Sequence, residues 1–174
     1  MLRVVSRADW LLLPAEVGDV WGGLLRTHKA VMSAMGEELE SAHGLDLTGY
    51  DVLRQLALAE RSRLRMGELA QRVMLTRSGL SGAVDRLESA GLVVREPTDD
   101  DGRGLYARIT PQGIRLLRRV TPTVENTVRR HFLDRLTAED LAALRAIWEK
   151  LGTARPLFAA SSSADRATSS LAGP

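Results

Sequence analysis

The spacing of apolar residues along the chain predicts a mainly helical protein. From Glu16 to Gly44, large side chains recur at steps of three and four residues, which is the period of one face of an α-helix. A helix of about seven turns exceeds the globular average and must bury its apolar stripe on something large. The stripe consists of Val17, Val20, Trp21, Leu24, Leu25, His28, Val31, Met32, Met35 and Leu39.

Two shorter helices are predicted after Gly44. The segment Thr48–Asp51 can act as a variant of the capping box, which opens a helix by satisfying its first amides. The next helix is predicted from Met66 to about Val73, and it lacks a serine, threonine or aspartate at the expected cap position. The inward face of the first of these helices is expected to comprise Val52, Leu53, Leu56 and Ala57.

A fourth helix is predicted from Arg77 to Ala90. Thr76 precedes it, and a threonine hydroxyl can accept a hydrogen bond from the unpaired amides of a first turn. Gly91 stands where a left-handed residue commonly ends a helix. The inward face, at positions i, i+4 and i+7, consists of Leu80, Val84 and Leu87.

A β-hairpin is predicted next. Val93 and Val94 begin one strand, and Leu105–Thr110 form its partner. The loop Thr98–Gly104 between them supplies two turn glycines and places one cation, Arg103, at its tip.

The last third of the chain predicts two more helices and a tail. Thr110 and Pro111 supply an N-cap and a proline at the first helical position, and Pro122 predicts a kink or break in that helix. Thr137–Asp140 can cap the last helix, and residues 153–174 have the composition of a disordered tail. The first apolar stripe contains Ile114, Leu117, Val120, Val124, Val128 and Phe132. The residues expected to be buried in the last helix are Leu141, Leu144, Ile147, Trp148 and Leu151.

The order of elements over Arg65–Arg108 is typical of a winged helix-turn-helix, whose second helix enters a major groove while its hairpin reaches the flanking minor groove. The run Leu75–Gly113 resembles the MarR family of bacterial regulators, with a recognition helix and exit that read SGLSGAVDRLESAGLV. Asp101–Arg103 match the Asp-x-Arg of that family's wing, and Ile109–Pro111 match the return of the wing. The upstream GLDLTGYDVLRQLA also fits, so the similarity covers roughly residues 15 to 152.

This resemblance implies a mainly α fold with a small β-hairpin wing, and a homodimer held by N- and C-terminal helices. Together with the lack of a clear period in residues 1–14 and the composition after Gly152, it divides the chain into an N-terminal extension (1–14), a helical dimerisation region (15–44 and 111–152), a winged helix-turn-helix DNA-binding domain (45–110) and a disordered tail (153–174). It also implies a repressor that binds a pseudo-palindromic operator in double-stranded DNA. The recognition helices would sit about 34 Å apart, and a small effector would release them by changing that distance.

Charge near the recognition helix favours DNA as the partner. The net charge is only +2, but six arginines lie between Arg61 and Arg86 against Glu68 and Asp85 alone. A charge run is often no more than a solvated face, yet beside a helix-turn-helix it indicates a phosphate-binding surface. The residues expected to contact DNA are Thr76, Arg77, Ser78, Ser81 and Arg86 on the helix and Arg103 on the wing.

The residue types suggest how the helix would read DNA. Arg77 can make a bidentate contact to guanine, and the serine hydroxyls can serve a base edge or a phosphate oxygen. The alternative for Ser78 is the ordinary preference of serine for helix N-termini. Gly79 and Gly82 are poor helix formers, and each lowers the stability of the helix by up to ~1 kcal/mol relative to alanine. Close approach of the backbone to DNA, or close packing on the preceding helix, would explain them.

The wing residues are assigned by the resemblance. Arg103 matches the wing arginine that enters the minor groove, where the negative potential is greatest over A·T-rich sequence. Asp101 would fix the wing, and Arg86 of the recognition helix is its expected partner. The alternative for Asp101 is an ordinary turn-forming aspartate.

A small aromatic effector is implied by the family. Trp21, His28, Met32 and Tyr50 are candidates to line its pocket, between the dimerisation helices and the winged domain. The alternative is that this aromatic and methionine stripe belongs to the core. The three histidines are scattered without ligand spacing, so we expect no metal site and no cofactor.

Other function classes are disfavoured. The chain contains no cysteine, which excludes disulfides and thiol-based peroxide sensing. It contains no apolar run long enough for a membrane span, so a cytoplasmic protein is expected. It shows no catalytic constellation, which argues against an enzyme built on this fold. A winged helix that binds protein rather than DNA remains the alternative, and it would expose apolar residues on the recognition helix.

Overall fold

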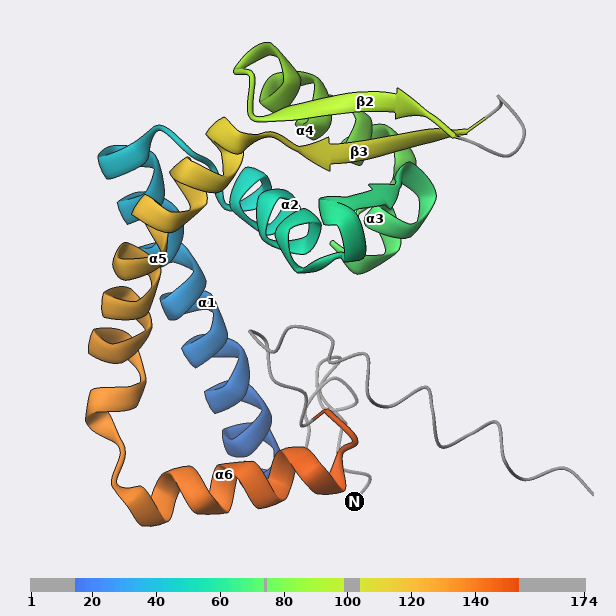
Figure 1. The fold of residues 1–174 in the computed structure, drawn as a ribbon. Coiled ribbons are helices and arrows are strands. Elements are labelled where there is room, and N and C mark those ends of the chain that lie inside the picture. The colour runs from blue at the N-terminus through green and yellow to red at the C-terminus, as the bar shows by residue number, and fades with distance from the viewer. Residues whose placement is uncertain (1–14, 74, 99–103, 154–174) are drawn as a thin grey trace, which may run out of the picture.

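A computed structural model describes residues 15–73, 75–98 and 104–153, and shows a lobe of short helices and strands joined to an arm of longer helices (Figure 1). The helices are α1 (Ala15–His43), α2 (Leu47–Leu58), α3 (Met66–Arg72), α4 (Arg77–Ser89), α5 (Pro111–His131) and α6 (Ala138–Lys150). The strands are β1 (Arg63–Arg65), β2 (Val93–Pro97) and β3 (Leu105–Ile109), with 3-10 turns η2 (Glu60–Ser62) and η3 (Leu133–Arg135). The mainly helical fold with a small sheet is therefore confirmed.

The sheet is antiparallel with the strand order β1-β3-β2, so it contains one strand more than the predicted hairpin. β1 pairs Arg63 with Arg108, and β2 pairs Val94 with the same residue from the other side. Three residues carry no recognisable period, which is why β1 was not predicted from the sequence.

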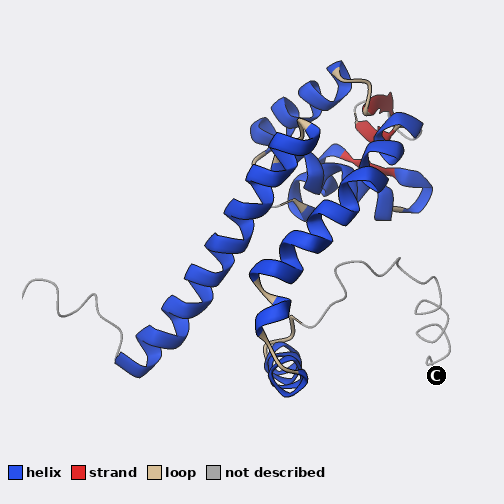
Figure 2. Cartoon of the chain, turned by 90° about the vertical axis from the view of Figure 1, so that its left-hand side faces the viewer, coloured by secondary structure: helices blue, strands red, loops and turns tan. Residues whose placement is uncertain are grey.

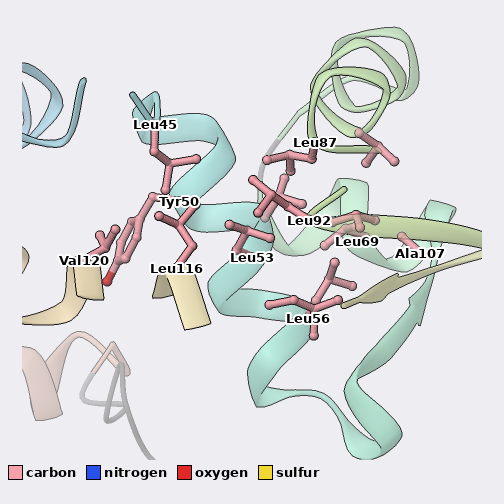
Figure 3. Close-up of a cluster of buried hydrophobic side chains, with 14 of the residues drawn as sticks. Leu45, Tyr50, Leu53, Leu56, Leu69, Leu87, Leu92, Ala107, Leu116 and Val120 are labelled. Atoms are coloured by element: carbon pink, nitrogen blue, oxygen red, sulfur yellow. The ribbon is translucent and has the colours of Figure 1, made fainter. Parts of the chain in front are cut away.

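The core of the lobe lies between the sheet and helices α2, α3 and α4. Leu53, Leu56, Leu69, Leu87 and Ala107 are buried together there (Figure 3). The inward face predicted for α4 is confirmed, because Leu80, Val84 and Leu87 are all buried.

The core extends from the lobe into the arm. Tyr50 at the start of α2 lies beside Leu116 and Val120 of α5 (Figure 3). The helices α1 and α5 then run side by side away from the lobe, with Leu39 and Val124 buried between them (Figures 1 and 2). The arm is thus joined to the lobe by shared packing as well as by the chain.

Most predicted helix ends are confirmed by hydrogen bonds. The hydroxyls of Thr76, Thr110 and Thr137 each accept from an amide of the following first turn. Asp140 completes a capping box with Thr137. Gly91, with φ +70°, ends α4 in the left-handed region that favours glycine.

One prediction about a helix start is wrong. The cap of α2 is Asp46 rather than Thr48, because Asp46 Oδ1 accepts from the Gly49 amide at 2.6 Å. Of the kink or break predicted at Pro122, the break does not occur, because α5 continues to His131. A proline removes one donor from a helix, and the packing of α5 on α1 stabilises the helix against that loss.

The predicted burial of the last helix is also wrong within a single chain. Leu141, Ile147 and Leu151 of α6 are exposed, and Leu144 and Trp148 are only half-buried. α6 crosses the far end of the arm, away from the lobe (Figure 1), and none of its residues is buried by the described part of the chain. The first turns of α1 are exposed in the same way, at Val17, Val20, Trp21, Leu24 and Leu25. None of the described helices is both long and apolar enough to span a bilayer.

Candidate nucleic-acid interface

The start of α4 presents hydroxyl groups and one guanidinium to solvent. The Thr76 hydroxyl accepts from the Gly79 amide at 3.1 Å and lies 3.2 Å from the Ser78 hydroxyl. Arg77 and Ser78 are both exposed, and Arg77 makes no ion pair with any described residue. This turn therefore offers free donors and acceptors together with the amide end of a helix, which attracts phosphate.

The outer face of α4 is open. Ser78 and Ser89 are exposed, and Ser81 and Gly82 between them are half-buried. A methyl group built on Gly82 would meet nothing within 4 Å. Close packing on the preceding helix therefore does not explain Gly82, and the α4 backbone is open at this position.

One flank of α4 is held by Arg95 of β2. The Arg95 guanidinium donates to Glu88 Oε2 at 2.5 Å, lies 2.7 Å from Asp85 Oδ1 and donates to the Ser81 carbonyl at 3.2 Å. The Arg95 amide donates to Glu88 Oε1 at 3.0 Å. Burial disfavours the charged side chain, but the hydrogen bonds to both carboxylates outweigh this and raise the pKa of Arg95. The wing strand and the helix are thus joined as one unit.

The role of Arg95 was missed in the sequence, although a signal was present. Val93 is buried and Val94 is exposed, so the two-residue period of a strand places Arg95 on the inward side. A charged residue at an inward position requires a partner of opposite charge.

The other flank of α4 is held by Asp46. Arg86 Nη2 donates to Asp46 Oδ2 at 2.9 Å, and Arg86 Nη1 donates to the Gly82 carbonyl at 3.3 Å. Asp101, the partner predicted for Arg86, lies outside the described residues. The described partner of Arg86 is therefore the residue that caps α2.

The base of the wing is closed by Thr98. Its amide donates to the Gly104 carbonyl at 3.1 Å, and its side chain is buried. A Cβ on Gly104 would lie 2.8 Å from Thr98 Cγ2, so a larger residue there would force the buried Thr98 side chain to shift. Arg103, the predicted minor-groove residue, falls in the loop 99–103 outside the described residues.

The outward face of the sheet carries a second basic cluster that the sequence did not reveal. The Arg63 guanidinium lies 4.3 Å from the centroid of the Tyr106 ring, and Arg65 lies 5.7 Å from it. Glu96 pairs with both Arg63 and Arg108. Because Arg63 and Arg65 belong to the unpredicted strand β1, their alignment with Tyr106 could not be anticipated.

The four predicted effector residues are not brought together within the chain. Trp21 and His28 are exposed on α1, Met32 packs against the core, and Tyr50 is buried between α2 and α5. Trp21 lies about 33 Å along α1 from the end near Tyr50, at 1.5 Å per residue.

A polar groove lies elsewhere on the arm, and its cavity volume is about 450 Å³. Its lining comes from α1, α5 and η3, and comprises Glu38, Thr123, Asn126, Arg129, Arg130 and Asp134. His43 contacts the Thr123 hydroxyl at 2.8 Å. No group of three or more candidate metal ligands occurs among the described residues.

Comparison with known proteins agrees with this geometry. A sequence model of the MarR family matches residues 43–104. The homoprotocatechuate degradative operon repressor of Escherichia coli is 30% identical over 135 residues, which cover 76% of this chain and 88% of the relative.

Two solved structures from Streptomyces coelicolor share the fold. Sco3205, a MarR family transcriptional regulator in complex with DNA, has a TM-score of 0.74 and 37% identity, covering 81% of this chain and 88% of the other. AbsC, a MarR family transcriptional regulator, has a TM-score of 0.73 and 33% identity, covering 81% of this chain and 95% of the other.

Proposed function

Since the chain belongs to the MarR family of transcriptional regulators, we propose that it represses transcription by binding a pseudo-palindromic operator as a homodimer. One observation carries this proposal. The helix α4 is fixed by its buried face, which comprises Leu80, Val84 and Leu87, and by the ion pairs of Arg95, while its first turn and outer face stay open. A helix fixed in this way can enter a major groove without losing its orientation.

The open surface suits DNA better than a protein partner. The exposed side chains of α4 include Arg77, Ser78, Arg86 and Ser89, and none of the exposed positions carries a large apolar residue. A protein-binding helix would instead present apolar anchors. Arg77 and Ser78 are the proposed base-reading residues, and Thr76, Ser81 and Arg86 are proposed phosphate contacts.

The homodimer is proposed from the exposed apolar faces of the arm. Contiguous apolar patches of this kind are uncommon on monomers and mark interaction surfaces. The proposed interface comprises Val17, Val20, Trp21, Leu24 and Leu25 of α1 with Leu141, Ile147 and Leu151 of α6. A two-fold axis through this arm would present two copies of α4 to the two halves of a palindrome.

Repression with release by an effector is the finer part of the proposal. It is supported by the relative named as an operon repressor. Trp21 is exposed within the proposed interface and His28 is exposed further along α1, so a pocket for an aromatic effector would need the second subunit to close it.

Selection of genomic fragments by the purified full-length protein tests the proposal. We expect the bound fragments to share a pseudo-palindrome with half-sites centred about 10 base pairs apart, or a multiple of that spacing. Arg77→Ala should weaken operator binding, and the matched control Arg119→Ala, at an exposed position of α5 outside the proposed interface, should not. Enrichment of no sequence would contradict DNA recognition, and enrichment of a single half-site would contradict the dimer.

A further inference from the structure

The Asp46 carboxylate serves two elements at once. Its Oδ1 accepts from the Gly49 amide at 2.6 Å and caps α2, while its Oδ2 accepts from Arg86 of α4 at 2.9 Å. One side chain thus joins the start of α2 to the proposed recognition helix, across a sequence separation of 40 residues.

Arg86 occupies the flank of α4 rather than the centre of its open face. At 3.6 residues per turn, it lies about 80° around the helix from Ser78. When a helix lies in a major groove, its flanks face the groove walls, which are lined with phosphates. Arg86 is therefore placed to contact the DNA backbone, and Asp46 competes for the same guanidinium.

The two flanking ion pairs differ in exposure. The Arg95 side chain is only 17% exposed, whereas Arg86 is 63% and Asp46 is 46% exposed. Exposed ion pairs between flexible side chains are weak. The Arg86–Asp46 pair can consequently open when a phosphate comes within contact distance, and the Arg95 pairs stay closed.

We propose that Asp46 is a specificity-determining residue that neutralises Arg86 until α4 is fully seated in its operator. This inference rests on the proposed DNA-binding function. On unrelated DNA, α4 does not seat fully in the major groove and Arg86 stays paired with Asp46. The charge of Arg86 then adds little to the sequence-independent attraction between protein and DNA. On the operator a phosphate replaces Asp46. The pair thereby lowers binding to competing sites without lowering binding to the correct one.

The substitution Asp46→Asn tests this directly, because asparagine caps a helix about as well as aspartate and removes only the charge. On unrelated DNA, the slope of log K against log salt should steepen by about 0.9 per subunit. For a dimer this equals roughly a tenfold greater loss of affinity between 50 and 200 mM salt. On the operator, the slope should stay unchanged, so the ratio of operator to unrelated affinity falls.

Three further variants separate the pair from general charge effects. Asp51→Asn is the matched control, since Asp51 also lies on α2 and pairs with Arg54 at 2.6 Å. It should leave the slope on unrelated DNA unchanged. Arg86→Ala should make the operator slope shallower by about 0.9 per subunit. The double variant Asp46→Asn with Arg86→Ala should show the wild-type slope on unrelated DNA.

The inference and the proposed function fail in different ways. If the wild-type protein selects no operator, the proposed function is wrong. If the wild-type protein selects an operator, but Asp46→Asn leaves the salt slopes on operator and on unrelated DNA unchanged, or changes both equally, Asp46 is only a helix cap. A steeper slope that persists in the double variant, or that Asp51→Asn reproduces, would also overturn the role of the Asp46–Arg86 pair.

Discussion

Arg95→Met should loosen the proposed recognition helix. Methionine keeps the length and the apolar stem of arginine but removes the guanidinium that contacts Asp85, Glu88 and the Ser81 carbonyl. All of these contacts reach α4 from β2, so the substitution detaches the wing strand from one flank of the helix.

The expected loss follows from the exposure of the carboxylates. Removing one partner of a fully buried ion pair costs about 3–5 kcal/mol, because the remaining charge stays buried. Asp85 is 61% exposed and Glu88 is 39% exposed, so both can regain water when Arg95 is removed. We therefore expect a smaller loss of about 2 kcal/mol, or roughly 4–8 °C in melting temperature for a chain of this size.

Thermal unfolding at one fixed protein concentration measures this loss, because dimerisation would make the midpoint concentration-dependent. Arg108→Met is the matched control, since Arg108 is on the adjacent strand and pairs with Glu96 on the exposed face of the sheet. It should change stability by less than about 0.5 kcal/mol. Hydrogen exchange should show faster opening of α4 in Arg95→Met only. Equal losses in both variants would refute the reasoning.

Four other outcomes are expected. Gly82→Ala should stabilise the fold by up to ~1 kcal/mol yet weaken operator binding; unchanged binding in a gel-shift titration would show that DNA does not approach that backbone. Burial raises the pKa of Tyr50, so its contribution to stability is complete below about pH 10 and is lost at higher pH; Tyr50→Phe should flatten this loss in alkaline unfolding curves. Sedimentation at micromolar concentration should give twice the chain mass of 19.0 kDa, and a 19.0 kDa species alone would exclude the dimer. Arg103→Ala should weaken binding to operator and to unrelated DNA alike and make the salt slope shallower, whereas Arg77→Ala should weaken operator binding most, by ~1–3 kcal/mol per half-site. Titrations on operator and on unrelated DNA distinguish these effects. Identical losses in the two variants would contradict separate roles for the wing and the recognition helix.

The sequence predicted those parts of the fold that depend on neighbouring residues. The caps at Thr76, Thr110 and Thr137 were recognisable because cap and amide lie within three residues. The sequence did not show that Asp46 rather than Thr48 caps α2. Both residues stand close to the start of the helix, and the turn after Gly44 decides which one faces the amides. The strand β1 also depends on a partner more than 40 residues away.

The parts of the site that the sequence did not predict also depend on contacts between residues that are distant in the sequence. Arg95 meets α4, and Arg86 meets Asp46, only after the lobe has folded. The exposed face of α6 has a different origin. An apolar stripe shows that a helix face avoids water, but it does not specify whether the same chain or a second copy covers it. The stripe therefore predicted burial that the single chain does not provide.

The double attachment of α4 also bears on how such a regulator diverges. The side chains that hold the helix, such as Arg86 and Glu88, are separate from Ser78 and Ser89 on its open face. Substitutions at Ser78 and Ser89 disturb no ion pair among the described residues, and surface changes of that kind rarely alter stability by more than about 0.5 kcal/mol. Under the proposed mode of recognition, a duplicated copy of the gene would acquire a new operator preference through few mutations, without first needing compensating changes elsewhere in the protein.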